Sequence, residues 1–230
     1  WEGLSPRPAG GPVRRLAYVG RLSPEKRPLD LLPLMHELPE HYRLTVAGHG
    51  PLEAEMRQAI VRRGLSSRVE MLGYVGDREK LELLCDTEAF LMPSPAELQS
   101  IATLEAMASG AAVVAWGYAS SAVPSLVEES RGGVVVPPGE PRRQAEAIVA
   151  LLEDPAALAA ARENARAYAR THDVALSAAR LEELYEGLVA AARRRAEGAV
   201  ARAPARARRG QLRGERARGR GVPQGEGVRT

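Results

Sequence analysis

Short apolar runs alternate with amphipathic stretches along most of this chain. The apolar runs are rich in aliphatic and β-branched residues and each leads into a turn, which is typical of buried strands. Six runs are predicted as strands: 15–19, 43–47, 69–72, 89–92, 112–115 and 134–136. Helical periodicity lies between and after them, at 29–38, 52–63, 78–85, 101–109, 123–129 and 144–153. The alternation predicts a parallel sheet with helices on both faces.

Two alanine-rich stretches follow, at 156–170 and 175–195, and both are predicted as helices that pack against the sheet domain. The second carries an apolar stripe at i, i+3, i+4 and i+7, formed by Leu181, Leu184, Tyr185 and Leu188. From Arg193 onward the chain is mostly Arg, Ala and Gly, which predicts disorder.

The domain organisation follows from these patterns. Residues 1–13, rich in Pro and Gly, are predicted as a linker, 14–192 as one domain with C-terminal helices, and 193–230 as a disordered tail. At 230 residues and 45% hydrophobic content, the chain can bury one substantial core. It begins with Trp1, so we expect further sequence upstream.

Charge and cysteine content bear on the possible partners and on the cellular compartment. The formal net charge is +3 and most of the excess lies in the tail, which could make weak contacts with anionic membranes. The tail has no interleaved aromatic residues, so no specific nucleic acid is expected. Cys85 is the only cysteine, which excludes an intrachain disulfide and suits a reducing compartment. With no membrane-length apolar run, we expect a cytoplasmic protein, at most peripheral at the inner face of the membrane.

The stretch 93–110 is the most informative part of the sequence. A Pro-rich turn leads into a helix closed by Gly110, and Ile101, Leu104 and Ala108 are predicted to form its apolar face. Between Glu97 and Val114 only Glu97 and Glu105 are charged. A carboxylate on such an apolar helix needs hydrogen-bond donors, and ligand hydroxyls would serve.

Glu97 precedes the N-terminus of this helix, which suits a phosphate or a polar sugar edge. Glu97 and Glu105 should lie roughly 12 Å apart, beyond the ~5–9.5 Å of paired-carboxylate hydrolysis. The pair therefore indicates one extended polar ligand held at both ends. The alternative is structural, with Glu105 capping a neighbouring loop and Glu97 solvated in a turn.

Two loops after predicted strands carry further candidate chemistry. The first, 20–26, places Gly20, Arg21 and Lys26 at a strand end, where two cations can neutralise a diphosphate. The second, 47–51, is a Gly-x-Gly-Pro turn that lacks the third glycine of the dinucleotide fingerprint. The histidines show no metal-ligand spacing and there is no nucleophile elbow, so neither a metal nor Ser-His-Asp catalysis is expected.

Taken in order, these motifs resemble the C-terminal half of family 4 retaining glycosyltransferases of the GT-B fold. The motifs are Gly20-Arg21 with Lys26, Val46–Pro51, Gly73, Pro93-Ser94, Glu97-x7-Glu105 and Glu105–Gly110. The resemblance spans about residues 15–190. It implies an α/β, Rossmann-like three-layer domain with a six-stranded parallel sheet, one half of a GT-B fold, followed by C-terminal helices and a disordered tail.

The resemblance also implies roles for individual residues. Arg21 and Lys26 would hold the diphosphate of a UDP- or GDP-sugar and stabilise the leaving group. Glu97 would contact the transferred sugar, and these three are the implied catalytic residues; Glu105 would bind the ribose. The other implied donor-binding residues are Gly20, Gly48, Gly50, Leu72, Gly73, Gln99, Ser100 and Ile101. Neither a cofactor nor a metal is implied.

The sequence departs from the family pattern at several places. Gln99-Ser100 stands where Phe-Gly is common, Arg27 where Gly is common and Ala112 where Pro is common. A Gly-Gly-x-x-Glu pattern is absent from 119–127. The hydroxyl of Ser100 is expected to cap the following helix.

The predicted function is the donor half of a hexosyltransferase, which binds an NDP-sugar for retaining transfer to a sugar or lipid acceptor. A missing N-terminal domain would hold the acceptor, so the chain alone is expected to be inactive. One alternative is a non-catalytic nucleotide-sugar binding module whose basic tail binds polyanions. Another is a GT-B relative such as a nucleotide-sugar epimerase, but the combination of Arg21, Lys26, Glu97 and Glu105 favours the transferase.

Overall fold

The computed structural model describes residues 5–202, and the side chains of 5–195. All six predicted strands are confirmed to within one residue at each end. They are β1 (Arg14–Val19), β2 (Tyr42–Ala47), β3 (Val69–Gly73), β4 (Ala89–Met92), β5 (Ala112–Trp116) and β6 (Gly133–Val136). They form one parallel sheet in the order β3-β2-β1-β4-β5-β6. The order reverses direction beside β1, which is where ligands bind in open α/β sheets.

The predicted helices also form. They are α1 (Leu31–Glu37), α2 (Glu53–Arg62), α3 (Asp77–Asp86), α4 (Ile101–Ala108), α5 (Val123–Ser130), α6 (Pro141–Leu152), α7 (Pro155–Arg170) and α8 (Val174–Arg202). Pro33 is tolerated in α1 because it lies in the first turn, where the missing N–H has no partner to lose. Asp154 caps α7 by accepting the backbone N–H groups of Ala156 and Ala157.

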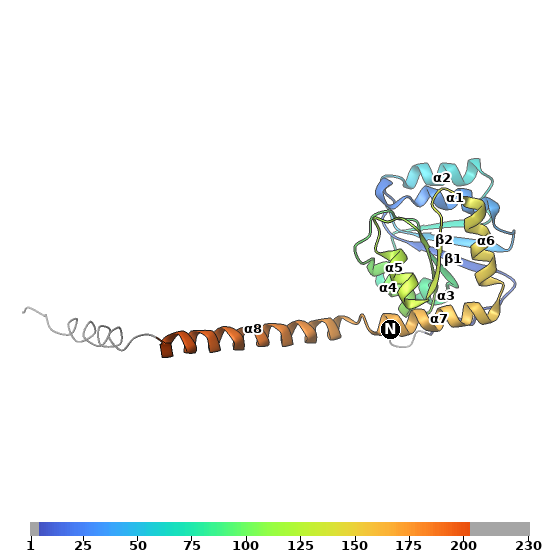
Figure 1. The fold of residues 1–230 in the computed structure, drawn as a ribbon. Helices are drawn as coiled ribbons and strands as arrows, with labels where there is room; N and C mark the ends of the chain where they lie inside the picture. Colours follow the sequence, from blue (N-terminus) through green and yellow to red (C-terminus); the bar gives the residue numbers. More distant parts are fainter. Residues whose placement is uncertain (1–4, 203–230) are drawn as a thin grey trace, which may run out of the picture. The chain divides into compact units, whose positions relative to one another are not determined.

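Alternation along the strands divides the core between the two faces of the sheet. Leu16 and Tyr18 of β1 face α1, α2 and α6, whereas Val19 faces the side covered by α3, α4 and α5. Helix α7 contributes Leu158 to the first cluster and Ala165 to the second. The predicted three-layer architecture is therefore confirmed, with helices above and below the sheet in Figure 1.

The chain divides after Asp173 into two compact units, earlier than the predicted boundary at 192. In the first unit, α7 contacts α4, β5 and β6, which agrees with the prediction that this helix packs against the sheet domain. Helix α8 belongs to the second unit and continues to Arg202, past the predicted start of disorder at Arg193. The extension is understandable because alanine and arginine are strong helix formers. The rest of the predicted tail, 203–230, lies outside the described residues, as do its predicted polyanion contacts.

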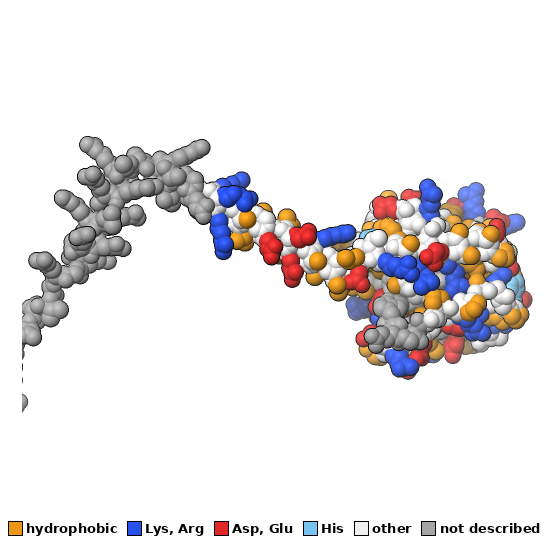
Figure 2. Space-filling model, turned by 90° about the horizontal axis from the view of Figure 1, so that it is seen from below, with side chains coloured by type: hydrophobic (Ala, Val, Ile, Leu, Met, Phe, Trp, Pro, Cys, Tyr) orange, Lys and Arg blue, Asp and Glu red, His pale blue; other side chains and the backbone are white. Residues whose placement is uncertain are grey.

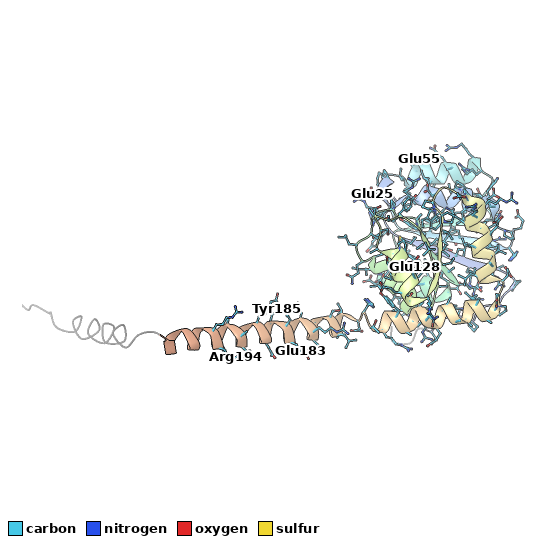
Figure 3. The ribbon with its side chains drawn as sticks, viewed as in Figure 1. Glu25, Glu55, Glu128, Glu183, Tyr185 and Arg194 are labelled. Atoms are coloured by element: carbon cyan, nitrogen blue, oxygen red, sulfur yellow. The ribbon has the colours of Figure 1, made fainter. Side chains whose placement is uncertain are left out.

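The predicted stripe of α8 is exposed. Leu181, Leu184, Tyr185 and Leu188 each expose about half of their surface, and apolar side chains recur along the helix in Figure 2. Glu183 and Tyr185 project from opposite sides of the helix in Figure 3. No helix within residues 5–202 is both long enough and apolar enough to cross a bilayer.

The described part of the predicted linker, 5–13, has no helix or strand but is hydrogen-bonded to the rest of the first unit. The Arg7 N–H donates to the carbonyl of Cys85 (2.8 Å), and Arg162 donates to the carbonyl of Arg7 (2.8 Å). The Gly10 N–H donates to the fully buried carboxylate of Glu88 (3.1 Å). This segment is thus fixed by hydrogen bonds at the amino edge of the sheet.

A carboxylate at the end of α6 anchors the same edge. Glu153 accepts hydrogen bonds from Arg14 Nη2 (2.7 Å) and the Tyr42 hydroxyl (2.9 Å), and its Oε1 lies 3.0 Å from His41 Nε2. The hydrogen bonds from Arg14, followed by those from His41 and Tyr42, hold the pKa of Glu153 down to about 2. Its ionised form is therefore favoured in the folded protein.

This lowered pKa makes stability sensitive to acid. The contribution of Glu153 should be complete above its unfolded pKa of about 4.3, and it should be lost as the pH falls towards about 2. Because the side chain is 39% exposed, we expect a loss of only about 1 kcal/mol after solvent screening. Urea unfolding of Glu153→Gln between pH 7 and 2.5 should show a smaller acid loss than wild type. Glu146→Gln, an exposed change on the same helix, should retain the wild-type loss, and identical curves for all three proteins would contradict the assignment.

Candidate functional site

The loop after β1 and the turn after β2 cross in close contact at the carboxyl edge of the sheet. The Gly20 N–H donates to the carbonyl of Ala47 (3.0 Å), and the Leu22 N–H donates to that of His49 (3.0 Å). A Cβ on Gly48 would overlap the carbonyl oxygen of Gly20, and one on Gly50 would overlap that of Leu22. The Gly-x-Gly-Pro turn is therefore required by the backbone crossing, and donor binding by its glycines stays a prediction.

Lys26 and Glu97 form an ion pair across this edge. Lys26 lies in a 3-10 turn (Pro24–Lys26) and Glu97 in the loop before α4, with Nζ and Oε1 2.6 Å apart. Only 11% of the Glu97 side chain is exposed, so the alternative of a solvated carboxylate is wrong. Arg21 is exposed and forms no ion pair with any residue that the structure describes.

The Tyr18 hydroxyl fixes the backbone of the first loop. It donates to the carbonyl of Arg21 (3.0 Å) from the end of β1. Burial, with smaller contributions from the charges of Glu97 and Glu25, raises the pKa of Tyr18 above its usual value. The hydroxyl therefore stays protonated and keeps donating, which holds the loop in place.

Glu105 has a partner that the sequence analysis did not identify. Lys80 of α3 donates to Glu105 Oε1 (2.8 Å), and the two side chains are 20% and 25% exposed. The alternative in which Glu105 caps a loop is wrong, because its partner lies on a neighbouring helix. The one signal for Lys80 was indirect: an acidic residue on an apolar helix requires a donor.

The predicted apolar face of α4 is wrong at Ile101, whereas Leu104 packs partly buried against the core. The residues it buries are Thr103, Ala106 and Met107, whereas Ile101 is 71% exposed. Because α4 has almost no polar residues, several faces fit helical spacing equally well. Packing against the sheet and α7 selects the buried one.

Ser100 begins α4 in the left-handed region, with φ 49°. Its hydroxyl bonds the Thr103 hydroxyl (2.7 Å) and no backbone N–H, so the predicted cap does not form. Arg27, after the 3-10 turn, also has φ 49°. Left-handed positions favour glycine, which gives a physical reason for the glycines common in the family at both places.

Two adjoining cavities lie along the carboxyl edge and share Val19 and Gly20. The first, about 370 Å³, is lined by Val19, Gly20, Arg21, Ala47, Gly48, His49, Tyr74, Val75, Asp77 and Lys80. The second, about 420 Å³, is lined by Tyr18, Val19, Gly20, Lys26, Met92, Glu97, Leu98, Gln99, Ser100, Ile101 and Ala102. Eight of the twelve predicted site residues thus line two neighbouring cavities.

Four predicted residues line neither cavity: Gly50, Leu72, Gly73 and Glu105. Gly73 lies close by, since its carbonyl accepts the Gly48 N–H (2.6 Å) and Tyr74 follows it. Tyr74 and His49 form an edge-to-face ring pair, with centroids 5.8 Å apart, on the wall of the first cavity. Sequence reasoning did not predict a site role for Tyr74 or His49, because the rings meet only through the fold.

The side chains suit an anionic, polyhydroxylated ligand. Arg21 and Lys26 supply positive charge, and Glu97 supplies acceptors for hydroxyl groups. Within the described residues, no three His, Cys, Asp or Glu side chains come together as metal ligands do.

Comparison with known proteins gives a consistent family. Residues 13–154 match the model of the glycosyl transferases group 1 family. Alpha-D-kanosaminyltransferase of Streptomyces kanamyceticus is 31% identical over 156 residues, covering 66% of this chain and 38% of that protein. This chain thus spans little more than a third of that relative's length.

Solved structures agree on the fold. Sucrose-phosphate synthase from Thermosynechococcus elongatus matches with a TM-score of 0.68 at 28% identity, over 78% of this chain and 46% of that one. HepE from Anabaena, solved with UDP-glucose, matches with a TM-score of 0.66 at 26% identity, over 76% of this chain and 49% of that one. The partial coverage agrees with one Rossmann-like half of a GT-B structure. With its family match covering more than half of its residues, this chain belongs to the group 1 glycosyltransferases.

Proposed function

We propose that this chain binds the nucleotide-sugar donor of a retaining hexosyltransferase and acts with a second domain that holds the acceptor. The observation that carries the proposal is the placement of Arg21, Lys26 and Glu97 around two adjoining cavities at the carboxyl edge of the sheet, with Glu105 paired to Lys80 on the wall of the first. A structural relative is solved with UDP-glucose, and another relative is named as GDP-mannose-dependent. These names support a UDP- or GDP-hexose as the donor.

The proposed chemistry is charge stabilisation at the leaving group. As the bond between the sugar and the diphosphate breaks, negative charge grows on the diphosphate oxygen. Arg21 and Lys26 would stabilise that charge from two sides without a bound metal. Glu97, held by Lys26 at one oxygen, would accept a hydrogen bond from a sugar hydroxyl with the other.

Isothermal titration calorimetry tests donor binding directly. We expect UDP or GDP to bind the folded chain in buffer that contains EDTA. Each nucleotide should be titrated alone and then again with magnesium, and the affinity should be similar in both cases. The absence of heat with both nucleotides, from protein shown to be folded by circular dichroism, would contradict the proposal.

Replacing Glu97 with glutamine should raise the affinity for the nucleotide and lower the additional affinity that the sugar provides. The change releases Lys26 from its ion pair, so affinity for the diphosphate alone should rise roughly fivefold, or about 1 kcal/mol. The extra affinity for the corresponding nucleotide sugar should fall, because the hydroxyl acceptor is weakened. Calorimetry with UDP and UDP-glucose, or GDP and GDP-mannose, measures both effects.

Glu25 provides the matched control. Its carboxylate lies on the same loop and accepts a hydrogen bond from the Ser23 hydroxyl (2.6 Å), whereas Lys26 pairs with Glu97. Glu25→Gln should leave the preference for the nucleotide sugar unchanged. Equal weakening of both ligands by Glu97→Gln would indicate that Glu97 only maintains the loop.

A further inference from the structure

Lys80 lies outside every motif that predicted the site, yet its ammonium group contacts Glu105. It projects from the first turn of α3, with Nζ 2.8 Å from Glu105 Oε1 and 3.4 Å from Asp77 Oδ1. The Glu105 side chain is 25% exposed, whereas that of Asp77 is 97% exposed. Water competes far more strongly for Asp77, so Glu105 is the better-held partner.

The contact leaves one carboxylate oxygen of Glu105 available. Among the residues that the structure describes, Lys80 is the only hydrogen-bond donor to this carboxylate, and it reaches Oε1. Oε2 is not one of the buried polar atoms that lack a partner, so it is not sealed inside the protein. A carboxylate held at one oxygen presents the other in a restricted direction, which favours a specific pair of ligand hydroxyls.

A direct contact between Lys80 and the diphosphate is the competing role, because Lys80 lines the same cavity as Arg21. The geometry favours an indirect role. The Lys80 ammonium is already bonded to Glu105, and only 20% of its side chain is exposed. Breaking that pair would leave the partly buried Glu105 carboxylate without its counter-charge.

We propose that Lys80 is a positioning residue that orients Glu105 towards the ribose hydroxyls of the nucleotide. The inference rests on the proposed function, since it requires a nucleoside diphosphate in this cleft. It adds Lys80 of α3 as a residue that contributes to ribose recognition by orienting the carboxylate of Glu105. The prediction that distinguishes this role is that Lys80 matters only when the ribose hydroxyls are present.

The test is calorimetry of the whole chain with the diphosphate that binds, UDP or GDP, and with its 2′,3′-dideoxy form. Lys80→Met should weaken binding of the normal nucleotide about tenfold and that of the dideoxy form less than about twofold. In a Glu105→Gln background, Lys80→Met should have no further effect. Lys80→Arg, which keeps a charged donor, should retain most of the affinity.

Arg78→Met is the matched control, because Arg78 lies on the same helix and is 87% exposed. It removes the same charge and should leave both affinities unchanged. Equal weakening of both nucleotides by Lys80→Met would overturn the positioning role in favour of a direct phosphate contact. Unchanged binding of both nucleotides by folded Lys80→Met would show that Lys80 has no role in nucleotide binding. Wild-type protein that binds neither UDP nor GDP would instead refute the proposed function, and with it this inference.

Discussion

Replacing Gly48 with alanine should destabilise the fold by about 3–5 kcal/mol. The backbone of Gly48 has φ 133°, and a Cβ there would overlap the carbonyl oxygen and carbon of Gly20. Neither atom can move away, because the Gly20 N–H is bonded to Ala47 and its carbonyl belongs to the loop that carries Arg21. The two loops must separate to admit the methyl group. Urea unfolding measures the loss, and nucleotide binding should fall with it.

Gly64 separates the effect of contact from that of conformation. It also has a left-handed φ of 68°, but a Cβ there meets nothing within 4 Å. Gly64→Ala should therefore cost only the strain of the conformation, about 1–2 kcal/mol. If both alanine variants lost the same stability, the crossing of the two loops would not be the reason for glycine at Gly48.

The strands could be predicted because buried parallel strands are continuous apolar runs bounded by turns. The run Ala89–Met92, for example, is buried at every position and was predicted without error. Helix α4 shows the limit of the same reasoning. Its sequence allows several apolar faces, and only packing against the sheet and α7 determines that Ile101 remains exposed.

The candidate site likewise has one part that the sequence predicts and another that depends on the fold. Arg21, Lys26 and Glu97 could be found because polar residues directly after buried strands gather at one edge of a parallel sheet. Their pairing could not be predicted, because the Lys26–Glu97 contact joins residues 71 positions apart. Lys80 was missed because it lies inside a helix, where a lysine is usually solvated. Its contact with Glu105 depends on how α3 packs against α4.

Removing both cations of the first loop should nearly abolish diphosphate binding. Each charge-assisted contact is worth about 1.5–3 kcal/mol, so the double variant Arg21→Met, Lys26→Met should lose roughly a hundredfold to ten-thousandfold in affinity. The single changes should differ. Lys26→Met leaves the Glu97 carboxylate unpaired and facing the phosphates, whereas Arg21 has no carboxylate partner in the described structure. We therefore expect Lys26→Met to be the more damaging change.

A compensating change tests whether the unpaired Glu97 carboxylate makes Lys26→Met the more damaging variant. Adding Glu97→Gln to Lys26→Met removes the repulsion between the unpaired Glu97 carboxylate and the phosphates. It should therefore recover part of the lost affinity for UDP or GDP. The double variant Arg57→Met, Arg78→Met removes two positive charges from the exposed faces of α2 and α3 and should bind normally.

Calorimetry at several salt concentrations should show a steeper salt dependence for wild type than for Arg21→Met, Lys26→Met. A double variant that bound the diphosphate as tightly as wild type would contradict this assignment, because among the described residues Lys80 is the only other Lys or Arg that lines the two cavities.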